Sequence, residues 1–147
     1  RRSLLRLPSM NADEALDRLL YAVAQALLAL RPAAPDLALV SHCYVLSRVT
    51  ADALALLGVE GTRLVIGHAD GVDAKHDRPV RTRHAWVEIG GKIIDPKLRL
   101  AQQVAPGNPL AYSNYVEEPG AEPFGLDGVV EDGVWPILAA AAIGRTD

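Results

Sequence analysis

The sequence predicts a single α+β domain in which N-terminal helices precede an antiparallel sheet. Apolar residues recur at helical spacing near the start of the chain. Further along, two strand-like segments flank Gly90-Gly91, a pair suited to a two-residue hairpin turn. With 147 residues, 50% of them hydrophobic, the chain is long enough to bury one core and too short to divide comfortably into two domains.

The first helix is expected over residues 12 to 30. Asn11 and Glu14 fit a capping-box-like start, and Pro32 lies just beyond the end, where proline cannot continue a helix. The apolar positions follow helical spacing and are Leu16, Leu19, Leu20, Val23, Leu27 and Leu30. We expect this stripe to face the core, and residues 1 to 10 to form a flexible arm.

A second helix is expected from Ser41, which is a good N-cap residue, to Leu57. Gly58 follows and supplies a C-terminal stop. Cys43 would then lie in the first turn of this helix. A thiol in this position is held by a rigid element rather than by a loop.

The middle of the chain predicts strands. Residues 62–69 form one, and residues 70–79, rich in Gly and Asp, form an exposed connection. Residues 82–89 and 92–95 then make the hairpin around the glycine pair.

The last third of the chain gives weaker signals. Short strands are expected around residues 112–116 and 129–130. The apolar stretch from Trp135 to Gly144 is much shorter than the roughly 20 residues that span a bilayer. We expect it to dock on the core.

Charge and cysteine content exclude several classes of protein. The net charge of −3 at pH 7, without a basic run, argues against a nucleic-acid partner. The single cysteine cannot form a disulfide within the chain, which argues against a secreted, disulfide-stapled scaffold. We expect a cytoplasmic protein that acts away from the membrane. Because the chain starts at Arg1 rather than Met, an upstream domain or a partner protein has to be considered.

The lone Cys43 has two interpretations, a buried packing residue or a reactive thiol. Cysteine attacks amides as the thiolate, which a helix N-terminus and a neighbouring histidine both favour. The predicted place of Cys43 meets the first condition. Candidate partners come later, in the block His84-Ala-Trp-Val-Glu-Ile-Gly-Gly-Lys-Ile-Ile-Asp-Pro96.

The segment from Cys43 to Gly67 resembles the nucleophile helix and following strand of transglutaminase-like proteins. The block from His84 to Pro96 resembles the histidine and aspartate strands of the same superfamily. This resemblance covers roughly residues 41 to 97. It implies a papain-like α+β core in which the nucleophile helix packs on an antiparallel sheet.

Residue by residue, the resemblance implies Cys43 as nucleophile, His84 as base and Asp95 as the acid that orients the base. It implies no metal or organic cofactor. The chain departs from papain-like proteases before Cys43, where it lacks their oxyanion-donating glutamine, so the donor beside the Cys43 amide stays unassigned. It also lacks the Arg-Gly-Gly approach of arylamine acetyltransferases.

Other side chains have alternative roles. His42 is a candidate substrate contact or oxyanion donor, with capping as the plainer reading. Trp86 is a candidate wall of the substrate cleft, with core packing as the rival. His68 and His76 could join Cys43 and His84 in a zinc site, although their spacing lacks a compact zinc signature.

The resemblance implies a cysteine peptidase or amidase that acts on a peptide or protein through a thioester. Within the superfamily, the compact size and the His-Ala-Trp-Val-Glu block also resemble the leader peptidases of lasso-peptide maturation. A glutamine deamidase or transglutaminase, of the effector or toxin kind, is the first alternative. A catalytically inactive peptide-binding module of the same fold is the second.

The hairpin register predicts which acid meets His84. A two-residue turn pairs Ile89 with Lys92, so that Asp95 lies diagonal to His84 on one sheet face. Glu88 shares that face but lies four residues along the strand from His84, about 13 Å away. We therefore expect Asp95 to bind His84.

Overall fold

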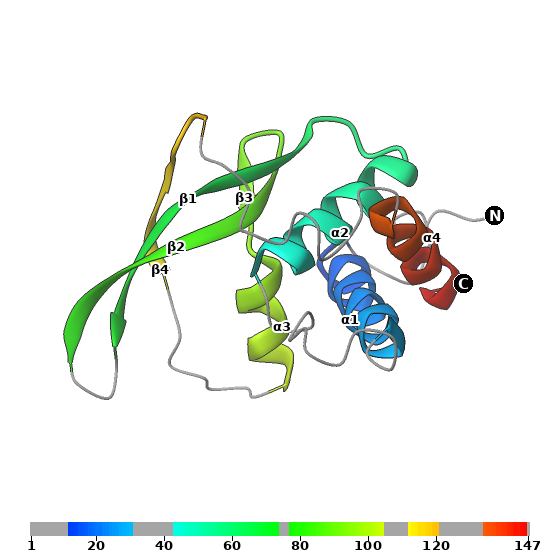
Figure 1. Ribbon diagram of the computed structural model, residues 1–147, viewed down its shortest axis with the longest axis horizontal. Helices are drawn as coiled ribbons and strands as arrows, with labels where there is room; N and C mark the ends of the chain where they lie inside the picture. The colour runs from blue at the N-terminus through cyan, green and yellow to red at the C-terminus, as the bar shows by residue number, and fades with distance from the viewer. Residues whose placement is uncertain (1–11, 31–42, 74–76, 105–111, 121–133, 147) are drawn as a thin grey trace.

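The computed structural model describes residues 12–30, 43–73, 77–104, 112–120 and 134–146. These residues form a sheet with the strand order β3-β2-β1-β4, in which every paired strand is antiparallel, together with helices packed beside it (Figure 1). The elements in chain order are α1 (Ala12–Leu30), α2 (Cys43–Leu56), β1 (Thr62–Asp73), β2 (Arg78–Ile89), β3 (Lys92–Ile94), α3 (Pro96–Val104), β4 (Tyr112–Glu117) and α4 (Val134–Thr146). The predicted α+β class, with an antiparallel sheet, is confirmed.

Helices α1, α2 and α4 form a layer at one end of the molecule, and the sheet extends from it (Figure 1). Helix α2 is central, with ten of its fourteen residues buried. Helix α4 docks against it, since Trp135 is buried and its ring meets Tyr44 edge-on at 6.2 Å. The apolar C-terminal segment therefore packs on the core, as its sequence predicts.

The end of α2 follows its predicted stop. Gly58 has φ +81°, a left-handed conformation that glycine adopts without a side-chain penalty. The N–H of Val59 donates to the carbonyl of Leu54, and that of Gly58 to the carbonyl of Ala55, each at 3.0 Å. These two bonds form a Schellman cap that satisfies carbonyls at the helix end. The expected start at Ser41 lies outside the described residues.

The hairpin between β2 and β3 has the predicted register. Gly90 and Gly91 both have positive φ, as a two-residue turn of the primed type requires. Ile89 pairs with Lys92 and Val87 pairs with Ile94. Strand β3 is three residues long and covers β2 only from Val87 to Ile89. Beyond that point, this edge of β2 is open to other elements.

The prediction that residues 70–79 form a connection is wrong. Strand β1 continues to Asp73 and β2 begins at Arg78, so most of this segment lies in the sheet. Local composition suggested a loop, but pairing outweighs it: Asp70 pairs with Arg81 across the strands, and their side chains meet at 2.8 Å.

Helix α3 has no counterpart among the predicted elements. It begins at Pro96, directly after β3, and proline is well suited to the first position of a helix because its missing N–H is not needed there. Asp95 is the N-cap, since its Oδ1 accepts the N–H of Leu98 at 3.2 Å. The dipeptide Asp-Pro was thus a helix start as well as a strand end.

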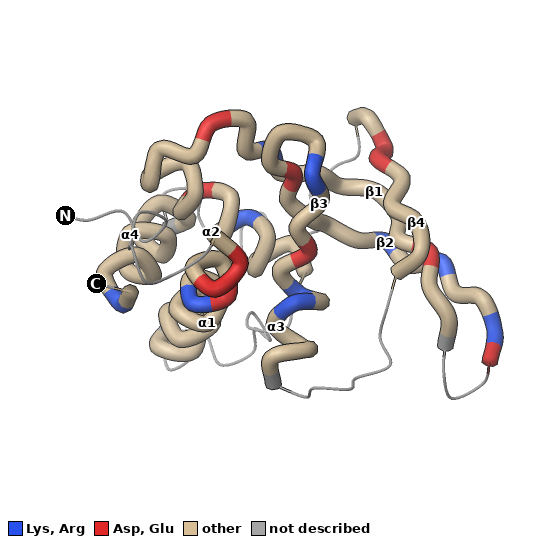
Figure 2. The backbone as a smooth tube through the Cα atoms, turned by 180° about the vertical axis from the view of Figure 1, so that it is seen from behind, with Lys and Arg blue, Asp and Glu red and all other residues tan. Residues whose placement is uncertain are grey.

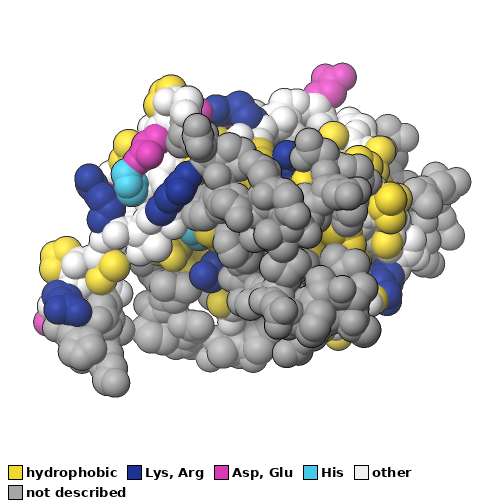
Figure 3. All heavy atoms as spheres, viewed as in Figure 1, with side chains coloured by type: hydrophobic (Ala, Val, Ile, Leu, Met, Phe, Trp, Pro, Cys, Tyr) yellow, Lys and Arg dark blue, Asp and Glu magenta, His cyan; other side chains and the backbone are white. Residues whose placement is uncertain are grey.

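In the described residues, Lys and Arg are interspersed with Asp and Glu rather than gathered in one region (Figure 2). On the face drawn in Figure 3, the Lys and Arg side chains are likewise scattered over the sheet and the helices. No helix in the described ranges is both long and apolar enough to cross a membrane. The flexible arm over residues 1–10 and the strand over residues 129–130 concern parts of the chain outside those ranges.

Candidate active site

Cys43 is the first residue of α2, and its side chain is largely buried where the helix meets β2. Burial raises the pKa of the thiol, whereas the interaction and positive charge of His84 lower it. The backbone N–H of Ala85 and the charge of Lys97 act in the same direction. The net effect is a pKa below the ordinary value for cysteine, which favours the nucleophilic thiolate.

His84 connects the thiol to the carboxylate. It lies on β2, is 1% exposed, and its Nε2 is 2.7 Å from Oδ2 of Asp95. Nε2 is committed to Asp95, so Nδ1 is the ring nitrogen left for the Cys43 sulfur. Burial lowers the pKa of His84, but the hydrogen bonds and negative charges of Asp95 and Cys43 raise it to about 9. The protonated ring is therefore favoured between the two anions.

Asp95 is held at the junction of β3 and α3. Its Oδ1 caps α3, and its Oδ2 accepts hydrogen bonds from His84 and from the hydroxyl of Tyr115, the latter at 2.8 Å. The residue is 5% exposed. A buried carboxylate that accepts three hydrogen bonds has a fixed orientation, so its charge is directed at the imidazole.

The predicted nucleophile, base and acid are thus brought together, and Glu88 is placed elsewhere. The Glu88 carboxylate binds Arg63 at 2.8 Å and lies 3.4 Å from Nε1 of Trp86. The expected pairing of His84 with Asp95 rather than with Glu88 is confirmed as geometry. Catalysis by these groups stays a prediction.

Helix α2 contacts strand β2 at Ala85, just beyond the part of β2 that pairs with β3. The Ala85 carbonyl accepts a hydrogen bond from the buried Ser47 hydroxyl at 3.1 Å, and the Ala85 N–H contributes to lowering the pKa of Cys43. Ser47 is one turn after Cys43 on the same face of α2. Helix α2 therefore supplies the hydrogen-bond donor that a longer β3 would have supplied to Ala85. This contact holds Cys43 beside β2, the strand that carries His84.

Replacing Ser47 with alanine is expected to destabilise the fold by about 1–3 kcal/mol, because the Ala85 carbonyl would be left buried without a donor. Urea unfolding measures this difference. Ser113→Ala is a matched control, since its hydroxyl also donates to a carbonyl, that of Asp70, but in an exposed position. Its expected cost is below about 0.5 kcal/mol. Equal losses of stability in the two variants would contradict a structural role for the Ser47–Ala85 hydrogen bond.

Aromatic rings surround the imidazole. The ring of Tyr112 is 4.9 Å from that of His84, the ring of Trp86 is stacked at 6.2 Å, and the rings of Trp86 and Tyr115 meet edge-on at 5.2 Å. Trp86 is 1% exposed, so its ring supports His84 from within the fold. This burial favours the core-packing role for Trp86, and a substrate contact by its ring stays a prediction.

The histidines outside this cluster are placed as follows. His68 lies on β1, where it pairs with Arg83 while its neighbour Gly67 pairs with His84, so the two histidines face opposite sides of the sheet. The side chain of His68 contacts Glu118. His42 and His76 lie outside the described residues. In the ranges that are described, no three His, Cys, Asp or Glu side chains lie close enough to hold a metal ion.

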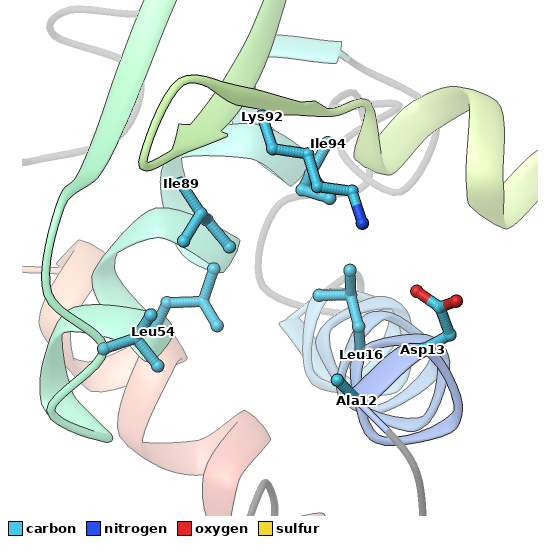
Figure 4. A pocket seen from close by; sticks show the side chains of 8 residues that line it. Ala12, Asp13, Leu16, Leu54, Ile89, Lys92 and Ile94 are labelled. Carbon is cyan, nitrogen blue, oxygen red and sulfur yellow. The ribbon is translucent and has the colours of Figure 1, made fainter.

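An apolar pocket of about 230 Å³ lies between the start of α1, the end of α2 and the hairpin (Figure 4). Its wall includes Leu16, Leu54 and Ile89, with Asp13 and Lys92 as its charged residues. Leu54 lies eleven residues after Cys43, about 16 Å along the helix. This pocket is therefore separate from the cluster around the thiol.

Two residues of the cluster were absent from the sequence-based prediction. Ser47 reads as an ordinary helix residue, and only its spacing of four from Cys43 hints that both face one partner. Tyr115 falls within the predicted strand, but β4 pairs with β1, a strand far away in sequence. Nothing local in the sequence indicates that pairing.

Comparison with models of known protein families found no match to the chain. A search of curated proteins gave no match, and neither did a search of solved structures. The fold and the site therefore define the structural class of the chain. The chain is an α+β protein in which a buried imidazole binds a carboxylate and also interacts with a buried thiol.

Proposed function

We propose that this protein is a cysteine-dependent amide hydrolase, most simply a peptidase that acts on a peptide or protein. The observation that carries the proposal is the linked set of groups on His84, whose ring binds Asp95 on one side and the Cys43 thiol on the other. A structural cysteine needs neither a lowered pKa nor an oriented histidine. Both features support a nucleophile.

In the proposed cycle, the Cys43 thiolate attacks the amide carbonyl and forms a tetrahedral oxyanion. Backbone N–H groups at the start of α2, where the helix dipole is positive, are suited to stabilise that charge. His84 donates its proton to the leaving amine, and a thioester remains on Cys43. His84 then takes a proton from water, which attacks the thioester and releases the acid.

The same geometry supports the transglutaminase-like fold that the sequence resembles. In that fold the nucleophile helix packs against an antiparallel sheet that carries the histidine, and here α2 packs against β1 and β2. We propose that the chain has this fold and that it works in the cytoplasm, where a lone thiol stays reduced. The cycle uses no metal or organic cofactor.

The proposed thiolate–imidazolium pair has a defined pH window. Cys43 has a lowered pKa, so the thiolate persists below the usual range for thiols, near 8.5, and is lost only at lower pH. His84 has its pKa raised to about 9, so the imidazolium is lost as the pH rises through that value. Amide hydrolysis should therefore give a bell-shaped profile of kcat/KM between these limits.

Two measurements test the proposal. The rate of Cys43 alkylation by iodoacetamide should stay high at mildly acidic pH, and a rate that rises only near the pKa of an ordinary thiol would favour the packing role or a binding module. Mass spectrometry of candidate peptides then separates the reactions. Peptide cleavage supports a peptidase, conversion of glutamine to glutamate supports a deamidase, and incorporation of an added amine supports a transglutaminase.

A further inference from the structure

Tyr115 belongs to the edge strand that is farthest from β3 in the sheet, and its side chain extends to the candidate site. It lies on β4 and pairs with Ala69 of β1, which pairs with Thr82 of β2, so its side chain shares a sheet face with that of His84. A register shift at Asp70 and Gly71 turns Tyr112 to this face as well, although the two tyrosines are three positions apart in the sequence. The rings of Tyr112 and Tyr115 are 5.8 Å apart.

Close packing of β4 on β1 fixes this approach. Gly67 pairs with His84 on one side and with Glu117 on the other. A Cβ atom on Gly67 would collide with the backbone of Val116, so the two strands come closer than a larger residue allows. The close packing of β4 on β1 therefore sets the position of the Tyr115 hydroxyl in the site.

We infer that Tyr115 is a positioning residue for the candidate nucleophile, acting through Asp95, and that its hydroxyl holds the carboxylate in line with His84. The inference rests on the proposed function. The same oxygen, Oδ2 of Asp95, accepts the Tyr115 hydroxyl at 2.8 Å and Nε2 of His84 at 2.7 Å. Oδ1 accepts the N–H of Leu98, so both carboxylate oxygens are fixed.

The hydroxyl is suited to this role because it stays protonated. Burial, followed by the charge and the hydrogen bond of Asp95, raises the pKa of the Tyr115 phenol well above its ordinary value. Within the pH window of the proposed reaction, the group is therefore a donor. Without it, Oδ2 loses one of its two donors, the carboxylate is freer to rotate, and the imidazolium is less well stabilised.

In the described part of the chain, titratable groups on β2, β4 and α3 interact with Asp95 or Cys43. These groups are His84 on β2, Tyr112 and Tyr115 on β4, and Lys97 on α3. Tyr112 makes no hydrogen bond to Asp95 in the described part of the chain, although the Asp95 charge contributes to raising its pKa. Tyr112 is therefore the matched comparison for the Tyr115 hydroxyl.

The test measures the alkylation rate of Cys43 against pH, which needs no knowledge of the substrate. Tyr115→Phe keeps the ring and removes the hydroxyl, and we expect its thiolate to form at higher pH. At mildly acidic pH its alkylation rate should fall roughly three- to tenfold. Tyr112→Phe should keep the wild-type midpoint. A Tyr115→Phe curve that coincides with the wild-type curve would overturn the inference.

A second comparison asks whether Tyr115 acts through Asp95. In an Asp95→Asn background, Tyr115→Phe should add no further shift, because its acceptor has lost its charge. An equal shift in both backgrounds would show that the tyrosine acts in another way. An ordinary alkylation curve in the wild type would instead defeat the proposed function, so the two failures are distinguishable.

Circular dichroism tests whether Tyr115→Phe folds. If it does not, a ring-fluorinated tyrosine at position 115 keeps the ring and hydroxyl while lowering the pKa of the phenol. If the hydroxyl acts on Asp95, this change in the phenol shifts the pH dependence of Cys43 alkylation. A tyrosine that serves only packing leaves the curve in place, and that result would overturn the inference.

Discussion

Cys43→Ala is expected to abolish amide hydrolysis and to leave the fold intact. The proposed thioester forms on the Cys43 sulfur, and the chain contains no second cysteine to replace it. The thiol is more buried than a cleft-facing residue would be, with 8% of the residue exposed, and it touches the core. Alanine therefore costs some packing, about 1 kcal/mol, which is small beside typical domain stability.

The measurement compares turnover of a cleaved peptide with the midpoint of urea unfolding. Cys43→Ser is the matched variant, because it keeps a hydroxyl in the same place while its far higher pKa makes it a poor nucleophile at neutral pH. Both variants should unfold near the wild-type midpoint and show no turnover above background. Turnover retained by Cys43→Ala would remove the thiol from the mechanism and would return Cys43 to a packing role.

Elements with strong local signals were predictable from the sequence. The sequence of residues 12–30 has an uninterrupted apolar stripe that follows a capping-box-like start, and the predicted bounds agree with those of α1. The hairpin register followed from the glycine pair, because a two-residue turn leaves one way to pair the strands. That register places Asp95 near His84.

Features that depend on distant pairing were not predictable in this way. Residues 70–79 have the composition of a loop, yet residues 70–73 and 78–79 pair because β1 and β2 extend past the core together. Helix α3 starts at a proline that was also consistent with a turn. The contact of Tyr115 with Asp95 requires β4 to cross to the outer side of β1, which no short-range pattern encodes.

The candidate site depends both on local sequence signals and on pairing between distant segments. Local signals place Cys43 at the start of a helix and His84 on a strand. Their contact depends on the short β3, because a longer strand would have paired with Ala85 and kept α2 away from it. The three-residue length of β3 is therefore as important for the candidate site as the identities of the residues within it.

Asp95→Asn is expected to lower turnover by about a thousandfold, with Glu88→Gln as a control that changes it less than about twofold. Both substitutions replace a carboxylate by an amide of the same shape, in or directly after the same hairpin. Only Asp95 contacts the imidazole, at 2.7 Å, whereas Glu88 pairs with Arg63. The loss of charge at Asp95 withdraws support from the imidazolium, and the amide also presents a donor where Tyr115 and His84 both donate.

Two readouts separate this effect from a loss of fold. Urea unfolding reports stability, and alkylation of Cys43 at mildly acidic pH reports the thiolate directly. In Asp95→Asn the pKa of His84 should fall, because the hydrogen bond and charge that raise it are gone, and the thiolate should then form only at higher pH. The Glu88→Gln curve should match the wild type. The reverse order of defects would make Glu88 the functional acid and would contradict the assignment of Asp95.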